Sequence, residues 1–312
     1  MIKMELGRHR DMEVSEHSTD TRFLVELRSL VFGHPQEAAR GVQHYMCVDA
    51  DTILTAMGEG TKAIEREIEL HGTEEDKECL DYILHSEAGT SSHVFPNGNL
   101  CCDCSADGQL LESRRIPNGD GAGMRLADFV AHPHSREAAL REPHVVALRL
   151  YTTAAYRSIN SPLRDLNRFQ RHEAHMLPVT VSFIADGVRK LRAIGASQKE
   201  DVNAMCGLYR GMKDVTVPDE FLENGGTELA PMSTTTDLAV AMSYSASTTC
   251  VLMRVHTTSF MERGADLSYL SAFPAESEIL FPPLTYLQPI GPAETITVGN
   301  ATCTVINVSP HL

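Results

Sequence analysis

The chain has 312 residues, of which 42% are hydrophobic, and it carries a formal net charge of −15 at pH 7. This length fits one large globular domain or two ordinary ones, and no apolar run reaches the roughly 20 residues of a membrane-spanning helix. Residues 1–15 mix charges of both signs and lack the apolar stretch of a signal peptide. We therefore expect a cytoplasmic protein without membrane contact, with delivery into another cell left open.

The acidity is concentrated in the first part of the chain. Residues 1–120 hold 11 Lys and Arg against 23 Asp and Glu, a net charge of −12, whereas residues 121–312 hold 16 against 19, a net charge of −3. An acidic surface repels phosphates, so a nucleic-acid partner is excluded. Such a surface suits a basic protein partner, or simply keeps the protein soluble.

Short helices and a small sheet are predicted in this first part. The run Thr73-Glu74-Glu75-Asp76 resembles a helix start with an acidic first turn, and Ile64 and Ile68 are four residues apart. Asn97-Gly98 and Asp107-Gly108 are typical of hairpin turns, which predicts a small sheet around residues 93–116.

Eight cysteines in a long chain without an export signal indicate free thiols rather than a disulfide framework. Cys101 and Cys104, together with His85 and His93, could be drawn into a tetrahedral zinc site. The second cysteine pair that makes such spacing specific is absent, so buried or idle thiols are expected and no metal.

The Gly-rich run 118–123 is the best linker, and it divides the chain into an accessory region, residues 1–120, and a domain of residues 121–312. After it, the apolar spacing predicts a helix over residues 145–159 and another over 184–194. Arg164, Arg168 and Arg171 share a face between them, for which a solvated surface is the default explanation and a substrate contact the alternative.

From about residue 203 the sequence changes to short β-rich runs separated by Gly, Pro and Asn. One helix interrupts them, beginning near Thr236-Asp237 and continuing to Tyr244, because Thr and Asp cap helix amides well. Helices followed by strands predict an α+β domain with largely antiparallel pairing. The strands are expected at 204–209, 250–256, 279–286, 295–298 and 302–308.

Three short motifs in this half carry functional groups. Arg210, within Leu208-Tyr209-Arg210-Gly211, offers fixed donors suited to phosphate oxygens, and Gly211 would let a ligand approach the backbone. Ser233-Thr234-Thr235 supplies hydroxyl groups that could bind a ribose and a carboxylate, or cap the following helix.

The third motif is the pair Glu276 and Glu278, in Phe273-Pro274-Ala275-Glu276-Ser277-Glu278. Two carboxylates separated by one residue project to the same side if the backbone is extended. Paired carboxylates raise each other's proton affinity and also drive glycoside cleavage through a sugar cation. Taken alone, each motif also fits an ordinary surface, and their combination and order decide the interpretation.

In that order the motifs resemble the Arg, Ser-Thr, Glu-x-Glu signature of the mono-ADP-ribosyltransferases, in the arginine-specific, toxin-like version. The resemblance covers residues 124–312 and implies two perpendicular, mainly antiparallel sheets preceded by a helical portion, with residues 1–120 as an N-terminal accessory region. It implies NAD as the substrate and an arginine-containing protein as the acceptor. Thr235 stands where the family most often has Ser.

The resemblance also implies residue roles. Glu278 would stabilise the ribose cation, Glu276 would deprotonate the acceptor guanidinium, and Phe273 would stack on it. Arg210 would bind phosphate and the nicotinamide ribose, and Ser233 would position Glu278. The implied NAD-binding residues are Arg210, Gly211, Tyr209, Ser233, Thr234, Thr235, Tyr151 and Asn160.

Two alternatives stay open. The same site would make the protein an NAD glycohydrolase if water were the acceptor. The protein would instead be a non-catalytic interaction protein if its acidic first region did the binding. A zinc protease is disfavoured because His172 and His175 are three residues apart, and redox use of NAD is disfavoured because no Gly-x-Gly-x-x-Gly turn is present.

Overall fold

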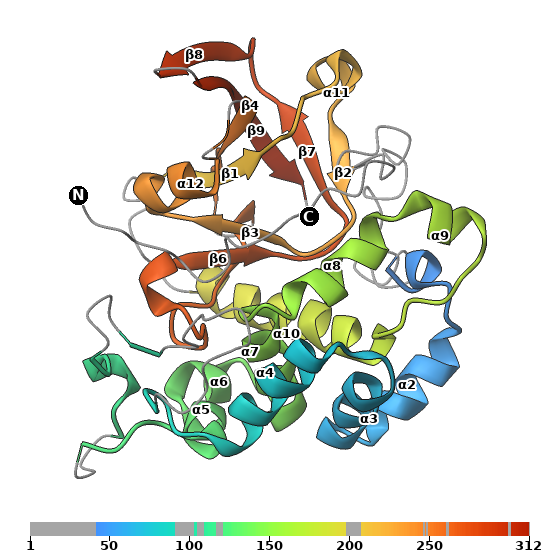
Figure 1. The fold of residues 1–312 in the computed structure, drawn as a ribbon, viewed down its shortest axis with the longest axis vertical. Coiled ribbons are helices and arrows are strands. Elements are labelled where there is room, and N and C mark those ends of the chain that lie inside the picture. Colours follow the sequence, from blue (N-terminus) through green and yellow to red (C-terminus); the bar gives the residue numbers. More distant parts are fainter. Residues whose placement is uncertain are drawn as a thin grey trace. The chain divides into compact units, whose positions relative to one another are not determined.

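The computed structural model describes residues 42–90, 103–104, 109–116, 121–197, 207–245, 247, 249–259, 262–298 and 301–311. These residues belong to two compact units (Figure 1). We call residues 43–191 with 267–275 the helical unit, and residues 192–266 with 276–312 the sheet unit. No helix in the described ranges is long and apolar enough to cross a membrane.

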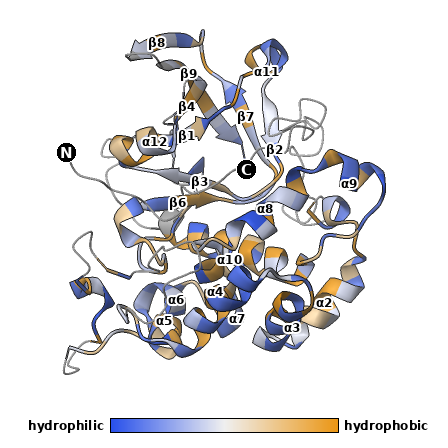
Figure 2. Cartoon of the chain, viewed as in Figure 1, coloured by the Kyte–Doolittle hydropathy of each residue, from blue (hydrophilic) through white to orange (hydrophobic). Residues whose placement is uncertain are grey.

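The helical unit is built from short helices packed around α7 (Glu142–Tyr151), nine of whose ten residues are buried. The other helices before the sheet are α2 (Ala50–Gly58), α3 (Thr61–His71), α4 (Glu74–His85), α5 (Leu126–Ala131), α6 (Pro133–Glu137), α8 (Tyr156–Arg164), α9 (Leu166–Gln170) and α10 (Pro178–Ser197). Helix α7 packs against α3, α4, α5 and α8. Hydrophobic and hydrophilic residues are mixed along these helices (Figure 2), which is typical of helices that bury one face. The predicted start of α4 is confirmed, because Thr73 and Asp76 form a reciprocal capping box.

The periodic stretch 145–159 forms two helices instead of the single helix expected from its spacing. Helix α7 ends at Tyr151 and α8 begins at Tyr156. Between them the hydroxyl groups of Thr152 and Thr153 each donate to the carbonyl three residues earlier, at 2.7 and 2.6 Å. Such local bonds compete with helix continuation, which the apolar pattern does not reveal. The second expected helix is confirmed as part of α10.

The arginine face expected beyond α8 does not exist as one surface. Asp165 separates α8 from α9 and caps the latter by accepting from the Arg168 N–H at 3.1 Å. The Arg168 side chain is buried and donates to three backbone carbonyls, whereas Arg171 is exposed and pairs with Glu173 at 2.6 Å. The expectation of a solvated face was therefore wrong for Arg168, which holds chain segments together.

The sheet unit contains one mixed sheet with α11 (Asp219–Asn224) and α12 (Leu238–Tyr244) packed on it. Its strands are β1 (Leu208–Lys213), β2 (Gly226–Glu228), β3 (Met232–Thr235), β4 (Thr249–Val255), β5 (Ala265–Asp266), β6 (Glu278–Phe281), β7 (Thr285–Pro289), β8 (Glu294–Val298) and β9 (Ala301–His311). Their order is β2-β7-β9-β4-β1-β3-β6-β5, with β8 on β9. Among the described strands only β4 and β9 pair in parallel. The predicted α+β class, with helices first and mainly antiparallel strands, is confirmed.

The sheet has two leaves that meet at a narrow link. Strands β1 and β3 are joined through the single register pair Tyr209 and Thr235, whereas β1 and β4 pair over six residues. The two sheets expected from the sequence are therefore continuous in hydrogen bonding at this one place. The link lies beside Arg210 and includes Thr235, the last residue of the Ser-Thr-Thr motif.

The core of the sheet unit follows the two-residue period of its strands. On β4, Val251 and Met253 join the main core together with Phe281, while Cys250 and Leu252 face the other side. Helix α12 covers that other side. The predicted helix is confirmed, and Asp237 caps it by accepting from Ala239 N–H at 2.8 Å. The strand expected over 279–286 is divided into β6 and β7 by the intervening prolines.

Two predictions fall largely outside the described residues. Of the sheet expected at 93–116, the structure describes isolated bridges from Cys104 to Leu110 and from Arg115 to Gly123. Cys101 and His93 lie outside the described ranges. Within those ranges no group of three or more His, Cys, Asp or Glu side chains is placed to hold a metal ion.

Candidate active site

Arg210 lies in the middle of β1, on the strand face that also carries Leu208 and Met212 of the main core. Its side chain is 14% exposed, so the guanidinium needs partners inside the sheet unit. It donates to the Ser233 carbonyl oxygen at 2.8 Å and lies 3.9 Å from a carboxylate oxygen of Glu228. The fold thus holds a cation against β3 and β2.

The Ser-Thr-Thr motif forms β3 and is bonded to the Glu-x-Glu segment. The Thr234 hydroxyl donates to the carbonyl of Ile279 at 2.8 Å, and the Thr235 hydroxyl donates to the carbonyl of Glu276 at 2.6 Å. Thr235 also accepts from the Asp237 N–H at 3.0 Å. These hydroxyl groups, which the sequence suggested for ligand binding, fix the start of β6 in the described structure.

The two motif carboxylates occupy different backbone environments. Glu276 ends a short 3-10 turn, Glu278 opens β6, and Ser277 between them has a φ of 47°, in the left-handed region. The extended backbone on which their same-side placement was predicted is therefore interrupted. The Glu276 carboxylate accepts from the Tyr244 hydroxyl at 2.7 Å, and the backbone of Glu278 is in register with Thr235.

The structure brings the three motifs together on neighbouring strands. Arg210 on β1 bonds to Ser233 on β3, and β3 pairs with β6, which Glu278 opens. Glu228, Glu276 and Glu278 are 2%, 4% and 1% exposed, so buried carboxylates accompany the one guanidinium of this site. Buried anions in a protein interior act strongly on a nearby positive charge. Such a site is suited to stabilising a cation.

Two members of this cluster were missed in the sequence. Glu228 lies in the Gly226–Glu228 strand, and Tyr244 ends α12. Neither belongs to one of the three motifs, and only the pairing of β2 with β7 and the packing of α12 reveal them. An acidic or aromatic residue in a short element gives no sequence signal of its own.

The remaining predicted site residues belong to the helical unit. Tyr151 and Asn160 are both buried, and the Asn160 amide donates to the Tyr151 hydroxyl at 3.3 Å. Among the described residues, the Asn160 side-chain oxygen has no hydrogen-bond partner. Phe273 is half-buried, and its N–H donates to the Ser271 hydroxyl at 3.0 Å.

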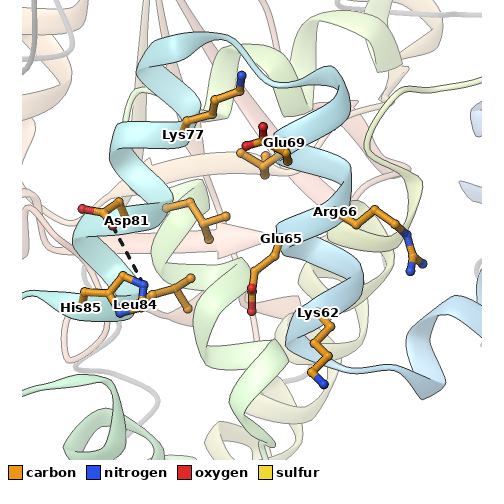
Figure 3. A pocket seen from close by; sticks show the side chains of 10 residues that line it. Lys62, Glu65, Arg66, Glu69, Lys77, Asp81, Leu84 and His85 are labelled. Atoms are coloured by element: carbon orange, nitrogen blue, oxygen red, sulfur yellow. Dashed lines mark ion pairs between the residues drawn. The ribbon is translucent and has the colours of Figure 1, made fainter.

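A separate pocket of about 450 Å³ lies between α3 and α4 (Figure 3). Its lining includes cations such as Lys62 and Lys77 beside the anions Glu65 and Asp81, and Asp81 lies 4.0 Å from His85. None of the residues expected to bind NAD or the acceptor lines it. The mixed charges give the pocket no preference for an anionic ligand.

Comparison with known proteins places the chain in a family. Residues 125–298 match the model of the NAD:arginine ADP-ribosyltransferase family. Similar solved structures include the ADP-ribosyltransferase HopU1 of Pseudomonas syringae pv. Tomato DC3000, with 21% identity, a TM-score of 0.43, and coverage of 60% of this chain and 88% of that one. Another is Plx2a, an ADP-ribosyltransferase toxin from Paenibacillus larvae, with 14% identity, a TM-score of 0.38, and coverage of 59% and 94%.

The type III effector XopAI of Xanthomonas axonopodis pv. citri is also similar, with 17% identity, a TM-score of 0.40, and coverage of 59% and 73%. No curated protein matches the sequence. The structural likenesses are distant, so the assignment depends on the family match, which spans more than half of the chain. The chain belongs to the NAD:arginine ADP-ribosyltransferase family, whose substrate is NAD.

Proposed function

We propose that this protein transfers ADP-ribose from NAD to arginine side chains of a protein and releases nicotinamide. The observation that supports it best is the placement of Arg210, Ser233 and Glu278 on the adjacent strands β1, β3 and β6. Family membership supplies the NAD-dependent ADP-ribosylation. The arginine acceptor is inferred from a glutamate at position 276.

Cleavage begins at the bond between ribose and nicotinamide. The bonding electrons leave with nicotinamide, so positive charge develops on the ribose in the transition state. We assign Glu278 to this charge, because a carboxylate beside the ribose stabilises the transition state more than the ground state, in which the positive charge lies on the nicotinamide ring. Arg210, which the Ser233 carbonyl holds in place, would bind the pyrophosphate through its guanidinium.

Transfer then needs a nucleophile that attacks the ribose carbon. We assign Glu276 to take a proton from the acceptor guanidinium, which is otherwise a cation and a poor nucleophile. The nitrogen forms a bond to the ribose carbon that nicotinamide has left. Phe273 would stack on the planar guanidinium and orient it.

Hydrolysis of NAD is the second candidate function, and one contact favours it. The Glu276 carboxylate is 4% exposed and accepts a hydrogen bond from the Tyr244 hydroxyl. In that arrangement Glu276 already has a hydrogen-bond partner and is shielded from an incoming arginine. The proposed role of Glu278 in NAD cleavage does not require that a protein acceptor reach it. Water would then replace arginine at the same ribose carbon.

One incubation separates these functions. The purified protein receives NAD labelled in its adenosine part, with and without agmatine, and nicotinamide and labelled products are separated by chromatography. A transferase makes ADP-ribosyl-agmatine, whereas a hydrolase makes free ADP-ribose whether or not agmatine is present. Absence of nicotinamide release under both conditions would refute the proposed enzymatic function.

A further inference from the structure

Residues 267–275 connect β5 to the Glu-x-Glu motif, and we call them the 267–275 segment. The segment contains Phe273 and leads through the next peptide bond into Glu276. It belongs to the helical unit, although the strands on both sides of it belong to the sheet unit. The contacts that hold it are therefore contacts with helices and with residues far earlier in the chain.

Two buried arginines bind the backbone of this segment. One guanidinium nitrogen of Arg114 donates to the carbonyls of Ser268 at 2.7 Å and Ser271 at 2.8 Å. Arg149 donates to the carbonyl of Leu270 at 2.8 Å. Guanidinium groups thus fix carbonyls at three nearby positions, and the fixed fork geometry of each group sets the spacing of these positions.

Asp103 joins the two arginines and compensates their charge. Its carboxylate is fully buried, lies 2.9 Å from Arg114 and 2.9 Å from Arg149, and accepts from the Tyr82 hydroxyl at 2.7 Å. Burial alone would raise the pKa of Asp103, but the two guanidinium groups outweigh it and lower that pKa. We call Asp103, Arg114 and Arg149 the loop clamp.

Further contacts reach the same segment from the helices. The Thr152 hydroxyl accepts from the Ala272 N–H at 3.0 Å. The Tyr269 ring stacks on His132 with centroids 4.5 Å apart, and its hydroxyl lies 3.0 Å from the Ser135 hydroxyl. The segment is therefore fixed by backbone and side-chain bonds along most of its length.

The energetics of the loop clamp indicate that it sets the geometry of the 267–275 segment. Replacing a buried ion cluster by apolar residues of similar volume is often neutral or stabilising, so such clusters are weak evidence for a contribution to stability. A loop clamp of guanidinium groups fixes direction and spacing, which apolar contacts do not. Its targets are also the carbonyls that precede Phe273 and Glu276.

We propose that the loop clamp is a positioning device that holds the 267–275 segment in the conformation that recognises the arginine acceptor. The inference depends on the proposed transfer function. Tyr82, Asp103 and Arg114 precede residue 125, where the family match begins. Residues outside the family domain would thus set the acceptor specificity of that domain.

The chain offers a matched control for this test. Arg168 is also buried and also donates to three backbone carbonyls, those of Tyr45, Pro162 and Glu173. None of these carbonyls belongs to the 267–275 segment. Arg168→Lys therefore repeats the chemical change of Arg114→Lys at a place where no effect on that segment is expected.

The first measurement uses activity. Arg114→Lys should raise the KM for agmatine and lower the ratio of transfer to NAD hydrolysis by about tenfold, the factor that corresponds to one lost charge-assisted hydrogen bond. The KM for NAD should change less than twofold. Arg168→Lys should leave both the ratio and the two KM values near those of the wild type.

The second measurement needs no catalysis. The chain contains no tryptophan, so Phe273→Trp introduces a single fluorescent reporter into the 267–275 segment. Its fluorescence anisotropy reports side-chain mobility on the nanosecond scale. Adding Arg114→Lys should lower the anisotropy, and adding Arg168→Lys should not.

The two measurements fail in distinguishable ways. If the wild type does not modify agmatine, the proposed function is wrong, and the anisotropy still decides whether the loop clamp orders the segment. Equal anisotropy in the Arg114→Lys and Arg168→Lys variants would overturn the positioning role, as would an unchanged ratio of transfer to hydrolysis. If Arg114→Lys does not fold, Arg149→Lys, which changes the other guanidinium group of the loop clamp and its bond to the Leu270 carbonyl, carries the same test.

Discussion

Glu276 and Glu278 are separated by one residue and are both buried, but they lie in different backbone environments. Glu276 lies in a turn, its carbonyl is bound by Thr235, and its carboxylate is bound by Tyr244. Glu278 opens a fully buried strand. Distinct surroundings would allow these two acids to take the two roles that we propose for them, one toward the sugar and the other toward the acceptor.

Glu278→Gln should lower nicotinamide release by at least about 100-fold, because it removes the anion assigned to the ribose cation and keeps the shape of the side chain. The measurement is the initial rate of nicotinamide release at saturating NAD. Glu294→Gln is the control, since Glu294 is an exposed glutamate on β8 of the same unit. Wild-type rates in Glu278→Gln would contradict the assignment.

Glu276→Gln should separate the two half-reactions. We expect nicotinamide release to stay within a few-fold of the wild type, while ADP-ribosyl-agmatine falls by about 100-fold because no base remains for the guanidinium. Both products come from one reaction mixture, so the comparison is internal. Parallel loss of both would show that Glu276 and Glu278 act as one unit.

Helix α12 and strand β1 approach each other at Gly211, and this contact explains a glycine that the sequence suggested for ligand binding. A Cβ atom at this position would lie 1.8 Å from the Ala241 carbonyl oxygen and 3.0 Å from the Ser245 nitrogen. Both atoms belong to the backbone of α12 and its C-cap, so they yield only if the helix moves. The absent side chain lets α12 pack on the sheet, and a role in NAD binding remains a proposal.

Gly211→Ala should therefore destabilise the protein by about 3 kcal/mol or more, since overpacking against backbone atoms forces α12 away from β1. The free energy of unfolding is measured by urea titration followed by circular dichroism. Gly58→Ala is the control, because a Cβ atom at Gly58 meets nothing within 4 Å. Equal stability of the two variants would contradict the packing explanation.

The sequence predicts elements well where periodicity and capping act alone. The box at Thr73, the cap at Asp237 and the strand expected at 250–256 are local signals, and each element forms, the strand as Thr249–Val255. The break between α7 and α8 depends on threonine hydroxyls that prefer local carbonyls, which hydrophobic spacing does not record. Of the three strands that carry the sheet-unit site, β1 and β6 overlap the strands expected at 204–209 and 279–286, whereas β3 was not expected. Glu228 reaches Arg210 only through the sheet order.

The described residues between 43 and 116 belong to the helical unit. Tyr82 and Asp103 bond to each other, and Asp103 bonds to Arg149 inside the family match. A buried ion cluster of this kind ties chain segments that are far apart in sequence. That residues 1–120 form an accessory region remains a prediction, and the loop clamp gives such a region a physical route to the 267–275 segment.

The stability of the whole protein should depend on pH through His175. This side chain is 2% exposed; one ring nitrogen lies 3.0 Å from the Ile159 carbonyl, and the other accepts from the Leu177 N–H at 2.9 Å. Protonation would put a second N–H against that of Leu177. Burial, opposed by the bond to Ile159, lowers the pKa of His175 from 6.5 to about 4.

The sign follows from proton uptake. Below pH 6.5 the unfolded chain binds a proton at this histidine, whereas the native state does so only near pH 4. The contribution of neutral His175 to the free energy of unfolding is therefore complete above pH 6.5. It is lost as the pH falls toward 4, for a total of about 3 kcal/mol. Urea unfolding at pH 7 and at pH 4.5 measures it, and the wild type should lose more stability than His175→Gln between these values.

Comparing the wild type with His175→Gln at each pH cancels the titration of other groups. One such group is Glu67, whose pKa is raised by burial. His172→Asn is the matched control, because His172 is exposed and asparagine tolerates its φ of 57°. Its pH dependence should equal that of the wild type. If His175→Gln instead loses as much stability on acidification as the wild type, His175 is not the titrating group, and the acid sensitivity of the fold lies elsewhere.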